Sequence, residues 1–142
     1  MSMTKTSFAS ASSAIVGRDG RILLVRRLNP PAADLYAFPG GRAEPGETPA
    51  ETALRELQEE TGLRGGNPRL FHFYELAAEA ESGTGGFLLS VFLVDVEDET
   101  EALAADDAAD LGWYRPDEIA RLPVPPSILD CLERLARARD DR

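Results

Sequence analysis

The spacing of apolar residues changes along the chain, and each spacing predicts a kind of secondary structure. Short runs rich in Val, Ile, Leu and Phe, bounded by Gly, Pro or Asp, are typical of β-strands. Such runs stand at 11–17, 21–27, 35–38, 69–80, 87–96 and 111–114. The run at 87–96 is almost continuously apolar, which predicts a central strand covered on both faces.

The segments between these runs predict two hairpins. Asp19-Gly20 is a tight-turn signal, so the first two runs are expected to pair with each other. The Gly-rich segment SGTGG at 82–86 predicts that the two long runs on either side of it fold back onto each other. The prolines of segment 29–34 interrupt the chain before the third run.

A helical pattern follows the third run. Thr48 and Glu51 match a capping box, and Pro49 occupies the first helical position. Gly62 is placed to end the helix in a left-handed conformation. These signals predict a helix of about thirteen residues.

Two different faces run side by side along this helix. At 100° per residue, one face is apolar and consists of Ala50, Ala53, Leu54 and Leu57. A neighbouring arc of about 100° carries Glu56, Glu59 and Glu60. The helix is therefore expected to be anchored on one side and lined with carboxylates on the next.

The remaining elements complete the expected fold class. An acidic connection at 97–110 precedes the last strand, and helices are expected at 116–122 and 125–138. Strands before, between and after helices predict an α/β sandwich with a mixed β-sheet. At 142 residues the chain fits a single domain, which we place at 8–142, with residues 1–7 loose.

The formal charge of −10 limits the partners. Lys and Arg number 15 against 25 Asp and Glu, and no basic patch is dense enough to hold a polymer of phosphates. No nucleic acid polymer is therefore expected as a partner. An acidic chain still binds a small polyphosphate when divalent cations lie between the two anions, so a small nucleotide stays open.

Targeting signals are not visible in the sequence. No apolar run approaches the roughly 18 residues that span a bilayer, so no membrane partner is expected. The polar start MSMTKTSFASASS lacks the apolar region of a secretion signal. The single Cys131 excludes an internal disulfide and is consistent with a reducing compartment. We expect a cytoplasmic protein.

Residues 38–63 crowd like charges, with six carboxylates against two arginines. Close carboxylates on one helix face repel by about 0.2 to 0.5 kcal/mol per pair. A solvated acidic face is the ordinary explanation of a charge run. Glutamates at i, i+3 and i+4 also present hard oxygen ligands of the kind that Mg²⁺ or Mn²⁺ takes, and bound cations would remove the repulsion.

The same stretch, FPGGRAEPGETPAETALRELQEETGL, carries a longer pattern of fixed positions. These positions have the spacing of the Nudix box, so the chain resembles the Nudix hydrolases. The box residues are Gly41, Glu47, Arg55, Glu56, Leu57, Glu59, Glu60, Gly62 and Leu63. The resemblance implies a Nudix-type α/β/α sandwich and metal-dependent cleavage of a phosphoric anhydride bond. It is also compatible with a homodimer.

The resemblance implies a metal site built on the helix. The ligands would be Glu56, Glu59, Glu60 and the carbonyl oxygen of Gly40, holding Mg²⁺ or Mn²⁺. In some relatives a further acid lies six residues before a tryptophan in the late loop, and Asp107 has that position here. Because its side chain is one methylene shorter than glutamate, a contact through water is the alternative to direct ligation.

The resemblance also implies catalytic and substrate-binding residues. Glu56 is the first candidate for the base that deprotonates the attacking water, although the identity of this glutamate differs within the family. Glu47 and Arg55 would orient the glutamates. Substrate phosphates would lie near Arg26, Arg27 and Gly41; strand-end arginines are often simply solvated, which is the alternative reading of the pair.

The substrate is less well specified than the reaction. Nudix resemblance implies a nucleoside diphosphate linked to a moiety X, cleaved to a nucleoside monophosphate and phospho-X. The start FPGGRAEPGE and the late GWYRPDEIARLPVPPS look most like small bacterial ADP-ribose pyrophosphatase-like proteins, which favours an ADP-ribose-like substrate. The alternatives are a (d)NTP pyrophosphohydrolase that sanitises the nucleotide pool and a non-catalytic nucleotide-binding regulator. The intact box carboxylates favour an enzyme over the regulator.

Overall fold

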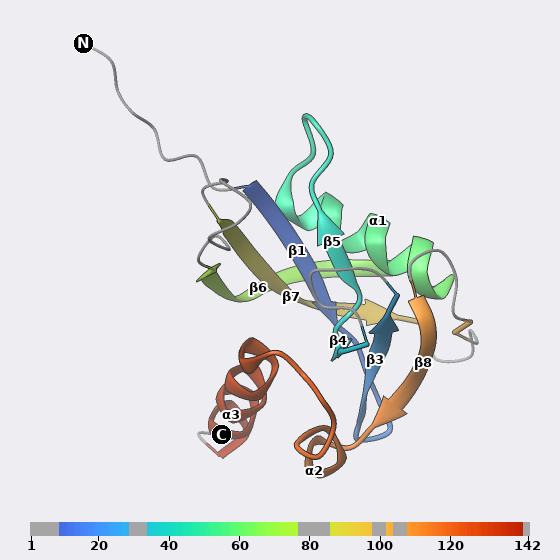
Figure 1. The fold of residues 1–142 in the computed structure, drawn as a ribbon, viewed down its shortest axis with the longest axis vertical. Helices are drawn as coiled ribbons and strands as arrows, with labels where there is room; N and C mark the ends of the chain where they lie inside the picture. The colour runs from blue at the N-terminus through green and yellow to red at the C-terminus, as the bar shows by residue number, and fades with distance from the viewer. Residues whose placement is uncertain (1–8, 29–33, 77–85, 98–101, 104–107, 141–142) are drawn as a thin grey trace.

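A computed structural model describes residues 9–28, 34–76, 86–97, 102–103 and 108–140. The strands are β1 (Ala9–Ile15), β2 (Gly17–Arg18), β3 (Arg21–Arg27), β4 (Tyr36–Ala37), β5 (Gly40–Arg42), β6 (Gly65–Leu76), β7 (Phe87–Val96) and β8 (Ala108–Tyr114). The helices are α1 (Pro49–Thr61), α2 (Pro116–Ile119) and α3 (Pro126–Asp140). Figure 1 shows α1 on one side of the strands and α2 and α3 on the other. The predicted α/β/α sandwich is confirmed.

The strands form two sheets. The first has the order β5-β1-β7-β6, and the second joins β2, β4 and β8 to β3. β1 runs parallel to β7, whereas β5 pairs antiparallel with β1 and β6 pairs antiparallel with β7. The first sheet is therefore mixed, as predicted, and the hairpin of the two long runs is confirmed by the β6–β7 pairing.

The hairpin predicted for the first two runs is only partly correct. Asp19 and Gly20 have φ of 54° and 76°, which is the geometry of a tight type I′ turn, but only β2 and β3 pair across it. The expected first strand instead belongs to the other sheet as β1. A strand has only two edges, and β5 and β7 occupy both edges of β1, so β3 pairs with β8 and β4 instead.

The last strand is longer than the sequence pattern suggested. β8 begins at Ala108 rather than 111, because its pairing with β3 continues back to Arg27, past an irregularity in the register. This pairing shortens the connection predicted at 97–110. Much of that connection, the loose N-terminus at 1–7, the turn at 82–86 and most of segment 29–34 lie outside the described residues.

Helix α1 has the predicted bounds and both predicted caps. The Thr48 hydroxyl accepts a hydrogen bond from the Glu51 amide at 3.2 Å, and the Glu51 carboxylate accepts one from the Thr48 amide at 2.8 Å. At the other end Gly62 has φ of 77°, and its amide donates to the Gln58 carbonyl at 2.8 Å. The helix is therefore fixed at both ends by local contacts.

Each helix layer has its own core against the sheets. The α1 side buries Ala53 and Leu57 against strand residues such as Phe92. The α3 side buries Ile128 and Cys131 against strand residues such as Val91. Neighbouring residues of β7 thus enter opposite cores, which confirms the prediction of a central strand covered on both faces. Among the described helices, none combines the length and the apolar composition of a membrane-spanning segment.

The left-handed cap supplies a stability prediction. Gly62→Ala should lower the free energy of unfolding by about 1 kcal/mol, because an L-residue is strained at positive φ. A Cβ at this position would meet no atom within 4 Å, so steric crowding adds nothing. The measurement is urea denaturation of both proteins.

Gly66→Ala is the matched control for this prediction. A Cβ at Gly66 would likewise meet no atom within 4 Å, and Gly66 does not have a positive φ. Its unfolding free energy should stay within about 0.5 kcal/mol of the parent protein. Equal effects of the two substitutions would show that backbone strain at the helix end is not what matters.

Candidate active site

Two glycines let the short strand β5 approach both β1 and helix α1. Gly40 pairs with Ser13, and a Cβ on Gly40 would lie 2.4 Å from the Ser12 carbonyl oxygen. A Cβ on Gly41 would lie 2.6 Å from the carboxylate carbon of Glu56. A side chain at Gly40 would push β5 away from β1, whereas a side chain at Gly41 would displace the Glu56 carboxylate. The two glycines therefore keep the glutamates of α1 close to the strand.

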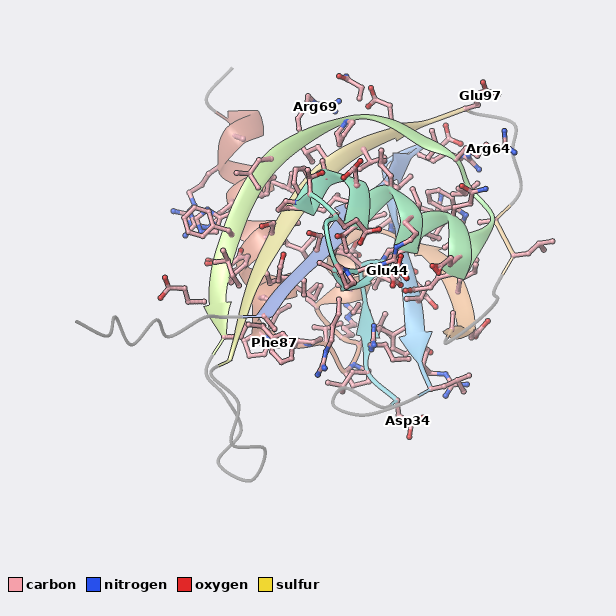
Figure 2. The ribbon with its side chains drawn as sticks, turned by 90° about the horizontal axis from the view of Figure 1, so that it is seen from above. Asp34, Glu44, Arg64, Arg69, Phe87 and Glu97 are labelled. Atoms are coloured by element: carbon pink, nitrogen blue, oxygen red, sulfur yellow. The ribbon has the colours of Figure 1, made fainter. Side chains whose placement is uncertain are left out.

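Arg55 supplies positive charge among the crowded carboxylates. Its Nε lies 2.6 Å from Glu47 Oε2 and 3.2 Å from Glu44 Oε1. Its Nη1 donates to Glu56 at 3.0 Å and to Glu59 at 2.6 Å. Its Nη2 also donates to a backbone carbonyl of β5 at 2.9 Å. The guanidinium therefore binds the loop before α1 to the carboxylate face of the helix, and Figure 2 shows Glu44 lying over this helix.

Glu47 is held in its ionised form. Its hydrogen bond with Arg55 and that from the Glu44 amide lower the pKa of Glu47 to about 2. The Thr52 hydroxyl donates a further hydrogen bond to Glu47 at 2.8 Å. Thr52 was missed in the sequence analysis. It could have been found as a polar residue one turn after the capping Thr48, beside the apolar face of the helix.

Glu60 lies deeper than the other glutamates, with 3% of its surface exposed. Burial and a hydrogen bond with the Glu56 carboxyl group raise the pKa of Glu60 well above its usual range. The nearby charge of Arg27 and the Gly40 backbone oppose this shift without cancelling it. Two carboxyl groups in direct contact need a shared proton or a cation between them.

The donor set fits a hard divalent cation. Carboxylate and carbonyl oxygens are the ligands that Mg²⁺ and Mn²⁺ prefer, and the Glu56–Glu60 pair has charge to be neutralised. The described part of the chain, however, contains no group of three or more Asp, Glu, His or Cys side chains that is already arranged to hold a metal ion. The hydrogen bonds from Arg55 explain this, because they draw Glu56 and Glu59 toward the guanidinium.

The other three predicted residues have three different outcomes. Arg27 is brought to the site, since its Nη1 lies 3.4 Å from the Gly40 carbonyl oxygen. Arg26 is not, because it forms an ion pair with Asp34 at 3.1 Å. Figure 2 shows Asp34 well away from Glu44. Asp107 lies outside the described residues, so its predicted role stays a prediction.

A pocket of about 210 Å³ adjoins the two glycines on the α3 side of the first sheet. Arg27, Gly40 and Gly41 line the end nearest the glutamates, and most of the remaining wall is apolar. At Phe87, labelled in Figure 2, the Arg42 guanidinium lies 4.6 Å from the ring centre. The pocket therefore joins a charged end to an apolar interior.

The wall formed by α3 is tied to β6 by a polar contact. The Tyr74 hydroxyl donates to Asp130 at 2.6 Å and lies 3.2 Å from the sulfur of Cys131. Arg134 donates to the same Asp130 carboxylate at 2.7 Å. These two hydrogen bonds hold the pKa of Asp130 below its usual range, so the carboxylate stays charged and the link persists at neutral pH.

Comparison with known proteins agrees with the fold and identifies the family. Residues 7–135 match the NUDIX domain family. An ADP-ribose pyrophosphatase from Methanocaldococcus jannaschii is 34% identical over 115 residues, covering 80% of this chain and 66% of that protein. A CTP pyrophosphohydrolase from Escherichia coli is 30% identical over 131 residues, covering 92% of this chain and 93% of that protein.

A solved structure gives the same result for the backbone. A MutT NUDIX hydrolase from Burkholderia pseudomallei has a TM-score of 0.77 and 25% identity, covering 90% of this chain and 98% of that chain. The agreement in sequence extends over almost the whole chain and accompanies the same fold. The protein therefore belongs to the Nudix hydrolase family, whose members act on pyrophosphate bonds.

Proposed function

We propose that this protein is a metal-dependent pyrophosphohydrolase that cleaves a nucleoside diphosphate linked to X, with an ADP-ribose-like substrate favoured. The products are a nucleoside monophosphate and phospho-X. The observation that carries the proposal is the contact between the buried Glu60 and Glu56, beside the glycine corner of β5. A stable fold gains nothing from two acids placed there, whereas a cation site requires them.

The residues that would hold Mg²⁺ or Mn²⁺ are Glu56, Glu59, Glu60 and the carbonyl of Gly40. When bound, the metal lowers the pKa of a coordinated water and offsets charge on the phosphoryl oxygens. Arg55 keeps Glu56 and Glu59 positioned on the same side of the helix through its hydrogen bonds. Glu47, which is ionised at neutral pH, fixes Arg55 in turn.

The chain's own groups account for proton and phosphate handling. Glu56 accepts a proton from the attacking water, whose oxygen forms a bond to one phosphorus. The bridging P–O bond breaks, and its electron pair leaves with the departing phosphate. Arg27, at the mouth of the pocket beside Gly40, supplies positive charge for the substrate phosphates.

A (d)NTP, such as CTP, is the second candidate substrate. The Escherichia coli CTP pyrophosphohydrolase covers more than nine-tenths of both chains, whereas this chain covers 66% of the archaeal ADP-ribose pyrophosphatase. A panel of ADP-ribose, NADH, diadenosine polyphosphates, CTP and canonical and oxidised dNTPs, ranked by kcat/KM with Mg²⁺, tests the proposal. A (d)NTP as the best substrate would overturn the ADP-ribose preference. Binding without turnover across the panel would favour a regulator.

Loss of one helix carboxylate should reduce turnover strongly. Glu59→Gln or Glu60→Gln should lower kcat by about a hundredfold or more, because a neutral amide is a poor ligand for Mg²⁺. Circular dichroism should show that the fold is retained. Glu133→Gln on α3, an exposed acid with a loose 3.8 Å contact to Arg137, is the control and should keep full activity. Unchanged turnover in both helix variants would remove the metal assignment.

Glu60 should make stabilisation by metal depend on pH. Because its folded pKa is raised, its contribution to stability without metal is full below about pH 4.5 and is lost as the pH rises through the folded pKa. Mg²⁺ needs the ionised carboxylate, so a fixed Mg²⁺ concentration should raise Tm more at about pH 8.5 than at about pH 6. Differential scanning fluorimetry measures both values.

The matched variant for this measurement is Glu60→Gln, which carries no titratable proton at the site. Its response to Mg²⁺ should be small and the same at both pH values. A wild-type response that is equal at both pH values would contradict the assignment of Glu60 as a ligand that exchanges its proton for a metal.

A further inference from the structure

Ser13 is a buried polar residue that the catalytic cluster does not use. It lies in β1 between Gly40 of β5 and Val91 of β7, with 7% of its surface exposed. Its hydroxyl oxygen is fully covered and has no hydrogen-bond partner among the described residues. Buried hydroxyl groups are normally paired, so an unpaired one at this place calls for a reason.

The side chain of Ser13 faces the pocket. In the parallel pairing of β1 and β7, Ser13 is opposite Val91 and Ile15 is opposite Leu93, and these partners pack in the α3 core. Ser13 alternates with Ala14, which packs in the α1 core. Ser13 is also among the residues that line the pocket, and a Cβ on Gly40 would lie 2.8 Å from the Ser13 Cβ. The absence of a side chain at Gly40 therefore lets β5 pack directly against Ser13 at this side of the pocket.

The surroundings of this hydroxyl are mostly apolar. The pocket wall includes Phe38, Leu89, Val91 and Ile128. The thiol of Cys131, also in the wall, is already in contact with the Tyr74 hydroxyl. Ser12 and Ser127 also line the pocket. The Ser12 hydroxyl is likewise buried and unpaired among the described residues, but strand alternation turns it to the α1 face, and Ser127 is partly exposed on α3. Ser13 is thus a buried hydrogen-bonding group on the pocket face, able to donate and to accept, in a mostly apolar wall next to the phosphate end of the site.

We propose that Ser13 is a specificity-determining residue, whose hydroxyl hydrogen-bonds one polar edge group of the nucleobase of the substrate. The inference rests on the proposed function, because it assumes a nucleotide whose phosphates lie at Gly40, Gly41 and Arg27. A flat heterocycle suits mostly apolar walls with few polar contacts. A terminal sugar would leave several hydroxyl groups unpaired against these walls, so the pocket selects the base end of the substrate.

The test measures binding without turnover. Adenosine, guanosine, cytidine and ribose 5-phosphate are titrated into the metal-free protein, followed by methyl NMR signals of Leu89 and Ile128. At least one nucleoside should saturate these signals, and ribose 5-phosphate should not. Ser13→Ala should weaken the binding of that nucleoside about five- to tenfold, the usual effect of one neutral hydrogen bond. Its Tm should not fall, because no hydrogen bond within the protein is lost.

Nucleosides that lack one edge group make the test specific. Purine riboside lacks the amino group of adenosine, inosine lacks the 2-amino group of guanosine, and uridine replaces the amino group of cytidine. Ser13→Ala should have no effect on the binding of the analogue that lacks the group contacted by the serine.

Ser90→Ala is the matched control, because Ser90 is a buried serine in β7 next to Val91 and on the opposite face of the sheet. It should leave every affinity unchanged.

Failure of the inference is distinguishable from failure of the proposed function. Equal nucleoside affinity in the parent protein and Ser13→Ala overturns the role of Ser13, even if the substrate panel shows hydrolysis. Ribose 5-phosphate that binds in the pocket more tightly than the nucleosides overturns the choice of the base. Serine-dependent nucleoside binding in a protein that hydrolyses no member of the panel supports the inference and contradicts the proposed function.

Discussion

The neutralisation of crowded negative charge is the constraint on which this structure depends. A short loop and one helix bring four carboxylates within 3.2 Å of the Arg55 guanidinium. This one cation allows the acids to be concentrated without unfolding the helix end, and it fixes their orientation at the same time. Glu60 lies deeper, against Glu56, and its raised pKa marks the position where a proton or a metal ion has to complete the balance.

The rest of the fold keeps this charged cluster beside an apolar pocket. The capping box and the left-handed Gly62 set the bounds of α1, and the glycines of β5 let it approach the strands. On the other side, the contact of Tyr74 with Asp130 ties the wall formed by α3 to β6. The two helices thus act on opposite faces of one sheet, one presenting acids and the other enclosing the pocket.

Sequence reasoning succeeded where the signal was local. The caps of α1 and the spacing of its glutamates depend on residues within one or two turns, and both have the predicted geometry. The first hairpin was wrong in part because strand pairing depends on which edges distant strands occupy. The ion pair of Arg26 with Asp34 depends on the fold of the following loop, which the position of Arg26 at a strand end does not reveal. Ser13 was missed because a serine in a strand pattern does not reveal whether its hydroxyl finds a partner.

The alternation of side chains along β1 and β5 has an evolutionary consequence. Gly41 meets Glu56 on one face of this strand pair, while Gly40 meets Ser13 on the other. Substitutions on the pocket face of these strands can therefore change which compound is recognised without changing the glutamates of α1. Paralogous proteins with this fold can therefore acquire different substrates by exchanging a few strand residues that face the pocket. The hydrolytic residues stay unchanged.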